Sequence, residues 1–146
     1  MMAILPSQSL AARLHQHGFK LTRARRAVIL ALEEAARPLS IAELHTAARA
    51  HAADIGLVTV YRTLEVLAGL GLVRPVHLLD NCHAYALCSP GHTHHVICQR
   101  CNRVVEIEGC DLSAYLEEIT ARTGYRITSH WLEIAGLCPE CQRAGD

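Results

Sequence analysis

The first seventy positions carry apolar residues at helical spacing, interrupted by short polar segments. After a weaker helical pattern near residues 8–17, the segment LTRARRAVILALEEAA starts from Thr22, a suitable helix cap, and keeps the helical period. The next segment, LSIAELHTAARAH, opens with Ser40 and has Glu43 three positions later, which is the pattern of a capping box. The front of the chain is therefore predicted to be helical.

The segment GLVTVYRTLEVLAGLGL is the third strong helical pattern. Val60, Leu64 and Leu67 fall on one face, and Gly69 and Gly71 supply a stop signal. A helix, a short turn and a second helix that ends in glycine form the arrangement of a helix-turn-helix. This pattern favours a DNA-binding function.

From residue 72 onward the hydrophobic period becomes strand-like. The segments LVRPVHLL and HAYALC flank DNC, a turn signal, and predict a hairpin that follows the helix-turn-helix as a wing. Further strands are predicted at HHVIC, at RVVEIEG and along YRITSHWLEIAGLC, with a helix at about 111–123. The second half of the chain is thus predicted to be α+β with a short sheet.

Composition agrees with a folded chain of 146 residues, 51% of them hydrophobic, in one domain or two small ones. The apolar runs are shorter than the ~20 residues of a membrane span, and the N-terminal pattern does not resemble a secretory signal. The net charge is zero, but residues 1–75 hold nine Lys/Arg against five Asp/Glu, and residues 76–146 hold five against nine. A basic front half favours a polyanionic partner.

Four of the seven cysteines form two C-x-x-C pairs, Cys98/Cys101 and Cys138/Cys141. In a reducing cytosol this spacing indicates metal ligation before disulfides, and four thiolates are a typical structural zinc set. The 36 residues between the pairs require the chain to fold back on itself. Redox dithiols and idle buried cysteines are the weaker alternatives.

Together, LTRARRAVILAL, IGLVTVYRTLEVLAGLGLV, HTHHVICQRCNRVVEIE and GLCPEC resemble the ferric uptake regulator family of bacterial metal-dependent repressors, in the right order over roughly residues 10–141. The resemblance implies a winged-helix DNA-binding domain at residues 1–80, a hinge at 81–90 and a metal-binding dimerisation domain at 91–146. It also implies a cytoplasmic homodimer that binds palindromic operators in double-stranded DNA.

A regulatory zinc site is the second implication of the resemblance. Cys88 lies ten positions before Cys98, as does the sensing cysteine of the zinc uptake regulator branch, and His77 and Glu106 match two further ligand positions of that branch. The remaining ligand is one of His92, His94 and His95, and the sequence leaves that choice open. If the wing turn centres on residues 82 and 83, His77 and Cys88 lie opposite each other on neighbouring strands, a suitable separation for two ligands of one ion.

Many members of the family have a further metal site. His92, His94 and His130 match its histidines, but the position of its acidic ligand holds Ser113, so that Asp111 or Glu117 would have to substitute. Cys82 and Cys110 are expected to pack without binding a metal.

In a helix-turn-helix, the first residues of the second helix face the base edges. Thr59, Tyr61 and Arg62 occupy these positions, and Arg62 is suited to guanine. Arg23 and Arg26 are expected to contact phosphates. The alternative is that these arginines belong to a solvated helix face.

The sequence therefore predicts a zinc-responsive repressor of zinc-uptake genes. An iron-, peroxide- or nickel-responsive regulator of the same family is the first alternative, and Cys88 argues against it because thiolate favours zinc. A zinc-ribbon interaction module without DNA is a remote alternative. An enzyme is disfavoured, since the chain lacks H-E-x-x-H, and its C-P-E-C pair comes without the H-x-E motif of base deaminases.

Overall fold

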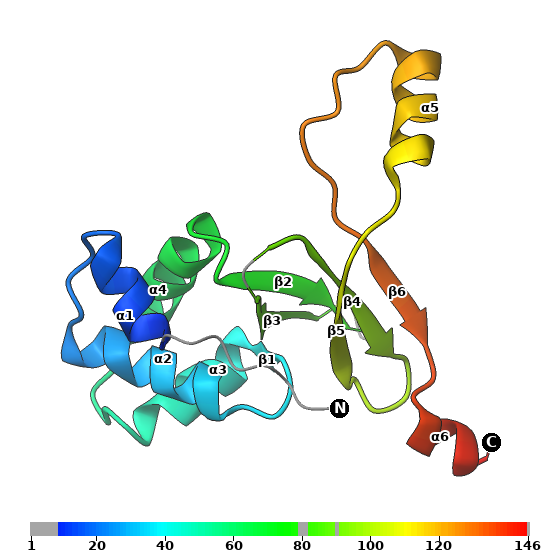
Figure 1. The fold of residues 1–146 in the computed structure, drawn as a ribbon. Coiled ribbons are helices and arrows are strands. Elements are labelled where there is room, and N and C mark those ends of the chain that lie inside the picture. The colour runs from blue at the N-terminus through cyan, green and yellow to red at the C-terminus, as the bar shows by residue number, and fades with distance from the viewer. Residues whose placement is uncertain (1–8, 79–81, 90, 146) are drawn as a thin grey trace. The chain divides into compact units, whose positions relative to one another are not determined.

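The computed structural model describes residues 9–78, 82–89 and 91–145, and the chain divides into two compact units, residues 1–90 and 91–146 (Figure 1). Among the helices described, none combines the length and the apolar character that crossing a membrane requires. Each unit has its own three-stranded sheet. The two units differ in the kinds of residue that they bury.

The first unit contains the predicted helices. They are α1 (Leu10–Gln16), α2 (Arg23–Glu34), α3 (Ile41–Arg49) and α4 (Leu57–Gly69). Their apolar faces meet in one core, in which Leu14, Val28, Leu44, Val60 and Leu67 have no solvent-exposed area. The three strong helical patterns of the sequence are confirmed, and α4 ends at the predicted glycine.

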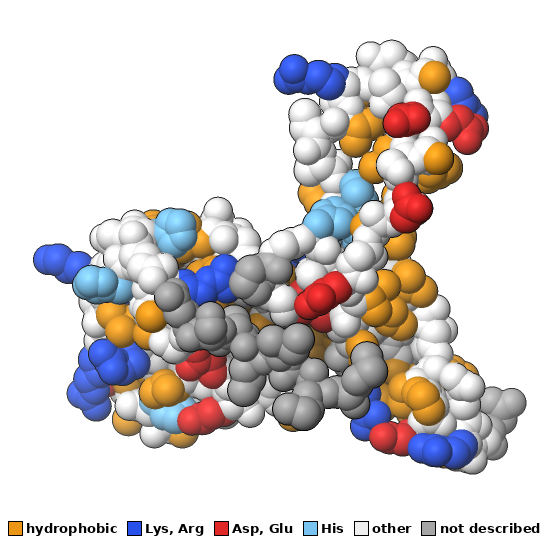
Figure 2. All heavy atoms as spheres, viewed as in Figure 1, with side chains coloured by type: hydrophobic (Ala, Val, Ile, Leu, Met, Phe, Trp, Pro, Cys, Tyr) orange, Lys and Arg blue, Asp and Glu red, His pale blue; other side chains and the backbone are white. Residues whose placement is uncertain are grey.

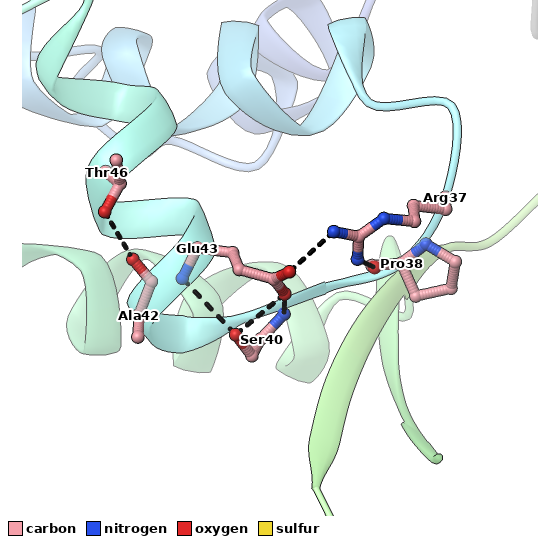
Figure 3. A network of polar contacts seen from close by, with 6 residues as sticks. All are labelled: Arg37, Pro38, Ser40, Ala42, Glu43 and Thr46. Carbon is pink, nitrogen blue, oxygen red and sulfur yellow. Dashed lines mark hydrogen bonds and ion pairs between the residues drawn. The ribbon is translucent and has the colours of Figure 1, made fainter. Parts of the chain in front are cut away.

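Polar caps set where two of these helices begin. The Thr22 hydroxyl accepts the backbone N–H of Arg25 at the start of α2. The predicted capping box is present at α3: the Ser40 hydroxyl accepts the Glu43 N–H at 3.3 Å, and the Glu43 carboxylate accepts the Ser40 N–H at 2.8 Å (Figure 3). Arg37 donates to the same carboxylate at 2.6 Å, and these hydrogen bonds, that of Arg37 foremost, lower the pKa of Glu43 to about 2.

The sheet of the first unit is antiparallel with strand order β1-β3-β2. Its strands are β1 (Leu39–Ser40), β2 (Val73–His77) and β3 (His83–Leu87). The predicted wing hairpin is confirmed as β2 and β3, although residues 79–81 of its turn lie outside the described residues. Strand β3 also occupies half of the segment that the sequence assigned to a hinge.

The register of the wing overturns one prediction. His77 pairs with His83, and the Cys88 N–H donates to the carbonyl of Leu72 at 3.0 Å. His77 and Leu72 are five strand positions apart, roughly 17 Å. The expectation that His77 and Cys88 lie opposite each other is therefore wrong. The observed strand pairs place the centre of the hairpin before residues 82 and 83.

The second unit is α+β, as predicted. It contains β4 (Thr93–Cys98), β5 (Val104–Glu108), α5 (Ser113–Thr123), β6 (Glu133–Gly136) and α6 (Pro139–Arg143). In its sheet β4 is central, antiparallel to β5 and parallel to β6. The strand predicted along residues 125–138 is reduced to β6, because β6 pairs with β4 only from His95 onward.

The second unit buries few apolar side chains. Of its described residues, those that are buried are Thr93, His94, His95, Ile97, Cys98 and Cys141. Large apolar side chains such as Tyr125 and Trp131 are instead 74% and 72% exposed. Figure 2 shows histidine side chains gathered at the foot of α5. Metal-binding residue types thus occupy the positions that apolar residues take in an ordinary core.

Candidate metal centres and nucleic-acid interface

The two C-x-x-C pairs converge in the second unit, as the sequence predicts. The sulfur atoms of Cys98, Cys101, Cys138 and Cys141 all lie within 4.8 Å of one another, and those of Cys101 and Cys138 are 3.8 Å apart. A tetrahedral ion with metal–sulfur bonds of ~2.3 Å separates its ligands by about 3.8 Å, whereas a disulfide has its sulfurs at about 2.05 Å. All four cysteines are free thiols, so the quartet has the geometry of a metal site.

Local structure prepares each pair for this role. The first pair lies on a tight turn after β4, in which Asn102 takes a left-handed conformation and its N–H donates to the Cys98 carbonyl. The second pair lies at the start of α6, where Cys138 is the N-cap and Pro139 is the first helical residue. Arg100 donates to the Cys141 carbonyl at 2.9 Å and holds the two turns together.

Hydrogen bonds make the thiols unequal. Backbone N–H groups, first that of Cys101 and then that of Cys138, lower the pKa of Cys98 to about 5, so this sulfur is a thiolate at neutral pH. The hydrogen bond with Cys138 and burial raise the pKa of Cys141 to about 12. A cation is therefore needed to deprotonate the whole quartet, and its binding releases protons.

A second cluster of donors lies at the foot of α5. It consists of His92, His94 and His130, which the sequence predicted, together with Cys110, which it did not. The Nε2 atom of His92 lies 3.1 Å from that of His94 and 2.9 Å from that of His130, and the Cys110 sulfur lies 3.1 Å from the latter. The expectation that Cys110 packs without metal-binding partners is not supported. The sequence offers one indication that Cys110 could bind a metal, because Cys110 lies three positions before residue 113, where the family has its acidic ligand.

Strand alternation separates the histidines of the 92–95 run. Successive residues of β4 point to opposite faces of the sheet, so His94 and His95 face opposite ways. His95 pairs with Glu106 across β4 and β5, and Thr93 on the same face donates to the Glu106 carboxylate at 2.6 Å. The structure thus places His92 and His94 in one cluster and His95 beside Glu106.

The other two predicted regulatory ligands lie in the first unit. Cys88 is buried and directly follows β3. His77 is at the far end of the wing, where its ring lies 4.8 Å from that of His83. Since the register separates His77 from Cys88, these two residues do not form one site.

The start of α4 presents the predicted base-reading residues at the surface of the first unit. Tyr61 is 47% exposed, Arg62 is exposed and Thr59 is half-buried. On α2, Arg23 and Arg26 are exposed. These side chains are accessible to a partner.

A known protein family matches most of the chain. Residues 16–135 match the ferric uptake regulator family, and the chain belongs to this family. It is therefore related to transcription regulators rather than to enzymes.

Two curated relatives share the same percentage identity with the chain. The zinc uptake regulation protein of Mycobacterium tuberculosis is 36% identical over 125 residues, which cover 86% of this chain and 96% of the relative. The ferric uptake regulation protein of Bacillus subtilis is 36% identical over 134 residues, covering 88% and 89%. Overall identity thus does not decide between zinc and iron.

Solved structures of the family share the fold. A zinc uptake regulator complexed with zinc and DNA aligns with a TM-score of 0.73 and 25% identity, over 91% of this chain and 90% of that chain. A zinc-bound manganese uptake regulator aligns with a TM-score of 0.62 and 25% identity, over 90% of this chain and 99% of that chain.

Proposed function

We propose that this protein is a cytoplasmic, zinc-responsive transcriptional repressor. In the proposal it binds palindromic operator DNA as a zinc-loaded homodimer and represses zinc-uptake genes. The observation that carries the proposal is the sulfur-rich chemistry of its metal centres within a family whose members are named as metal uptake regulators. The similarity to the mycobacterial zinc uptake regulation protein supports it.

Ligand chemistry favours zinc over iron in two places. The cysteine quartet offers four thiolates in a closed set, which suits a structural zinc ion and leaves no position for a reactant. At the proposed regulatory site, Cys88 adds a sulfur to the imidazole of His95 and the carboxylate of Glu106. Iron(II) and manganese(II) prefer more oxygen-rich sets, so a thiolate ligand shifts the preference toward zinc.

In this proposal the regulatory zinc takes its ligands from both units of the chain. Cys88 belongs to the first unit, and His95 and Glu106 belong to the second. A ligand shifts a conformational equilibrium only by binding one arrangement better than another. Donors on two units can bind one ion only when the units are arranged so that the donors meet. Zinc binding therefore favours these arrangements of the units. His77 is not part of this proposed set, because the wing register places it away from Cys88.

The DNA-binding role rests on the exposed start of α4. Arg62 can donate two hydrogen bonds to one guanine, while Arg23 and Arg26 can neutralise phosphates. A homodimer presents two such helices to two half-sites, and fixing their spacing is how zinc would control binding. Exposed apolar residues of the second unit, among them Tyr115, Tyr125 and Trp131, are suited to a dimer interface.

Selection from a library of random DNA duplexes tests the proposal without assuming an operator sequence. The protein is loaded with zinc, iron(II) or nickel(II), and the duplexes that it retains are sequenced. We expect a palindromic site to be enriched with zinc, and its binding to be lost in a chelator that leaves the cysteine quartet occupied. Full activation by iron(II) at lower free metal than zinc would instead support the iron-responsive alternative.

The matched pair of variants is Cys88→Ser and Cys82→Ser. Cys82 is exposed and lies six positions before Cys88 in the sequence, so it serves as the control cysteine. We expect Cys88→Ser to abolish zinc-dependent binding and Cys82→Ser to leave it intact. Equal binding by both variants would contradict the assignment of Cys88.

A further inference from the structure

The cluster at the foot of α5 has one ligand that the resemblance does not account for. We propose that Cys110 is the fourth ligand of a metal site formed with His92, His94 and His130. The set then has three nitrogens and one sulfur, and it is closed without a carboxylate. This site is separate from the proposed regulatory set and does not depend on it.

The distances fit a single ion. All four ligand atoms lie within 4.8 Å of one another, and the three closest pairs are 2.9 to 3.1 Å apart. A tetrahedral zinc ion with nitrogen and sulfur ligands separates them by about 3.3–3.6 Å. The side chains therefore need to move apart only slightly to surround an ion.

The nearby oxygen donors have other positions or partners. The Ser113 hydroxyl, at the position where the family resemblance expects an acid, donates to the Asp111 carboxylate at 2.9 Å. Glu117 lies one turn into α5 and lines the same surface pocket as His130, but its carboxylate is not among the ligand atoms that lie within 4.8 Å of one another in the cluster. Among the described His, Cys, Asp and Glu side chains, Cys110 is the one that joins the three histidines in a cluster. A thiolate in this place makes the site softer and favours zinc over iron or manganese.

One hydrogen bond must change when an ion binds. The Leu132 N–H donates to Nδ1 of His94 at 3.1 Å, so in the neutral ring the proton is on Nε2. Coordination of the neutral ring through Nε2 requires the ring proton to be on Nδ1 instead, and Nδ1 can then no longer accept the hydrogen bond from Leu132. The loss of one such hydrogen bond is small beside the free energy of zinc binding by a closed four-ligand set.

The location of the site indicates its role. Cys110 directly precedes the segment that contains α5, and His130 ends it, so the ion would join both ends of an arm of about twenty residues (Figure 1). No residue of α5, all of which is described, is buried. Because packing does not hold α5 to the sheet, a metal cross-link at its base restricts the arm and fixes where Tyr115 and Tyr125 are presented. Both tyrosines are exposed.

Cobalt(II) spectroscopy tests the sulfur ligand directly. The full chain carrying Cys88→Ser is purified with zinc in its cysteine quartet and titrated with cobalt(II), while the zinc content is followed by native mass spectrometry. We expect one equivalent of cobalt to bind in tetrahedral coordination and to show a thiolate-to-cobalt charge-transfer band. Adding Cys110→Ser should remove the band, and adding Cys82→Ser should leave it unchanged.

Cys110→Asp separates loss of the ligand from loss of folding. Aspartate can replace the sulfur with an oxygen, so this variant should still bind one cobalt ion but without the charge-transfer band. A band that persists without Cys110, or the absence of cobalt binding in the Cys88→Ser parent, would overturn the proposal. Operator binding is not the measured quantity, so failure here is distinct from failure of zinc-responsive repression.

Discussion

The two units of this chain reach a stable fold by different means. In residues 1–90, four helices bury leucine, valine, isoleucine and alanine side chains in one continuous core. In residues 91–146, the buried residues within the described part are mainly histidine and cysteine. Small domains that cannot bury enough apolar surface commonly depend on a metal. The first unit should therefore be stable without metal, and the second should not.

Removing one quartet ligand should have the largest effect. Cys138→Ser leaves three thiolates and disrupts a site of the kind whose apparent binding free energy is roughly 10–16 kcal/mol. We expect the chain to lose the quartet zinc and the second unit to lose its ordered structure, and with it any other metal that this unit holds, while the helices of the first unit remain. Amide NMR spectra, together with zinc counts from native mass spectrometry, measure both. A second unit that stays folded without that zinc ion would show that its fold does not depend on the metal.

A core truncation in the first unit should have the opposite pattern. Leu64 is 2% exposed on the buried face of α4, and leucine-to-alanine changes at such positions cost about 2–5 kcal/mol. Leu64→Ala should lower the unfolding temperature of the helical unit and leave the quartet zinc in place. Calorimetry with the metal count as a second readout checks this. Release of zinc in step with helix unfolding would mean that the two units unfold together.

A surface change in the first unit should affect binding without affecting either fold. Arg62→Ala should weaken operator binding by about 1–3 kcal/mol and relax the sequence preference at one position of each half-site. Arg23→Ala is the control for a phosphate contact, and it should weaken binding to all sequences and reduce the salt dependence. Fluorescence anisotropy at several salt concentrations distinguishes these outcomes. A uniform loss in Arg62→Ala would assign Arg62 to the DNA backbone instead.

The smallest effect is expected at the capping box of α3. Glu43→Ala should lower the stability of the helical unit by about 1 kcal/mol, measured by denaturant unfolding at neutral pH. The pKa of Glu43 is lowered to about 2, below its value in an unfolded chain. Its stabilising contribution is therefore present above about pH 4.3 and is lost as the pH falls toward 2. In Arg37→Ala the carboxyl should titrate at higher pH, and an unchanged NMR titration would refute the role of Arg37.

The parts of the fold that local chemistry determines could be predicted from the sequence. The caps at Thr22 and Ser40 and the glycine stop of α4 depend on neighbours within a few residues. The convergence of the cysteine quartet was predictable as well, because two C-x-x-C turns satisfy zinc only together.

Features that depend on pairing between distant segments could not be predicted. The length of the turn decides the wing register, and the sequence is compatible with several turn lengths. The expected register paired His77 with Cys88, whereas the structure pairs His77 with His83, five positions earlier. Cys110 was missed because it lies three positions before the expected acidic ligand. Its role becomes visible only when the chain returns to place His130 beside it.

Native mass spectrometry of the parent and of Cys88→Ser, combined with operator binding by the same samples, tests whether zinc bound at Cys88 controls DNA binding. We predict that Cys88→Ser loses one zinc ion per chain, keeps the quartet zinc and the dimer, and no longer responds to zinc in DNA binding. An unchanged zinc count would mean that Cys88 holds no zinc, and operator binding that is equally strong after chelation of the regulatory zinc would mean that this zinc does not control DNA binding.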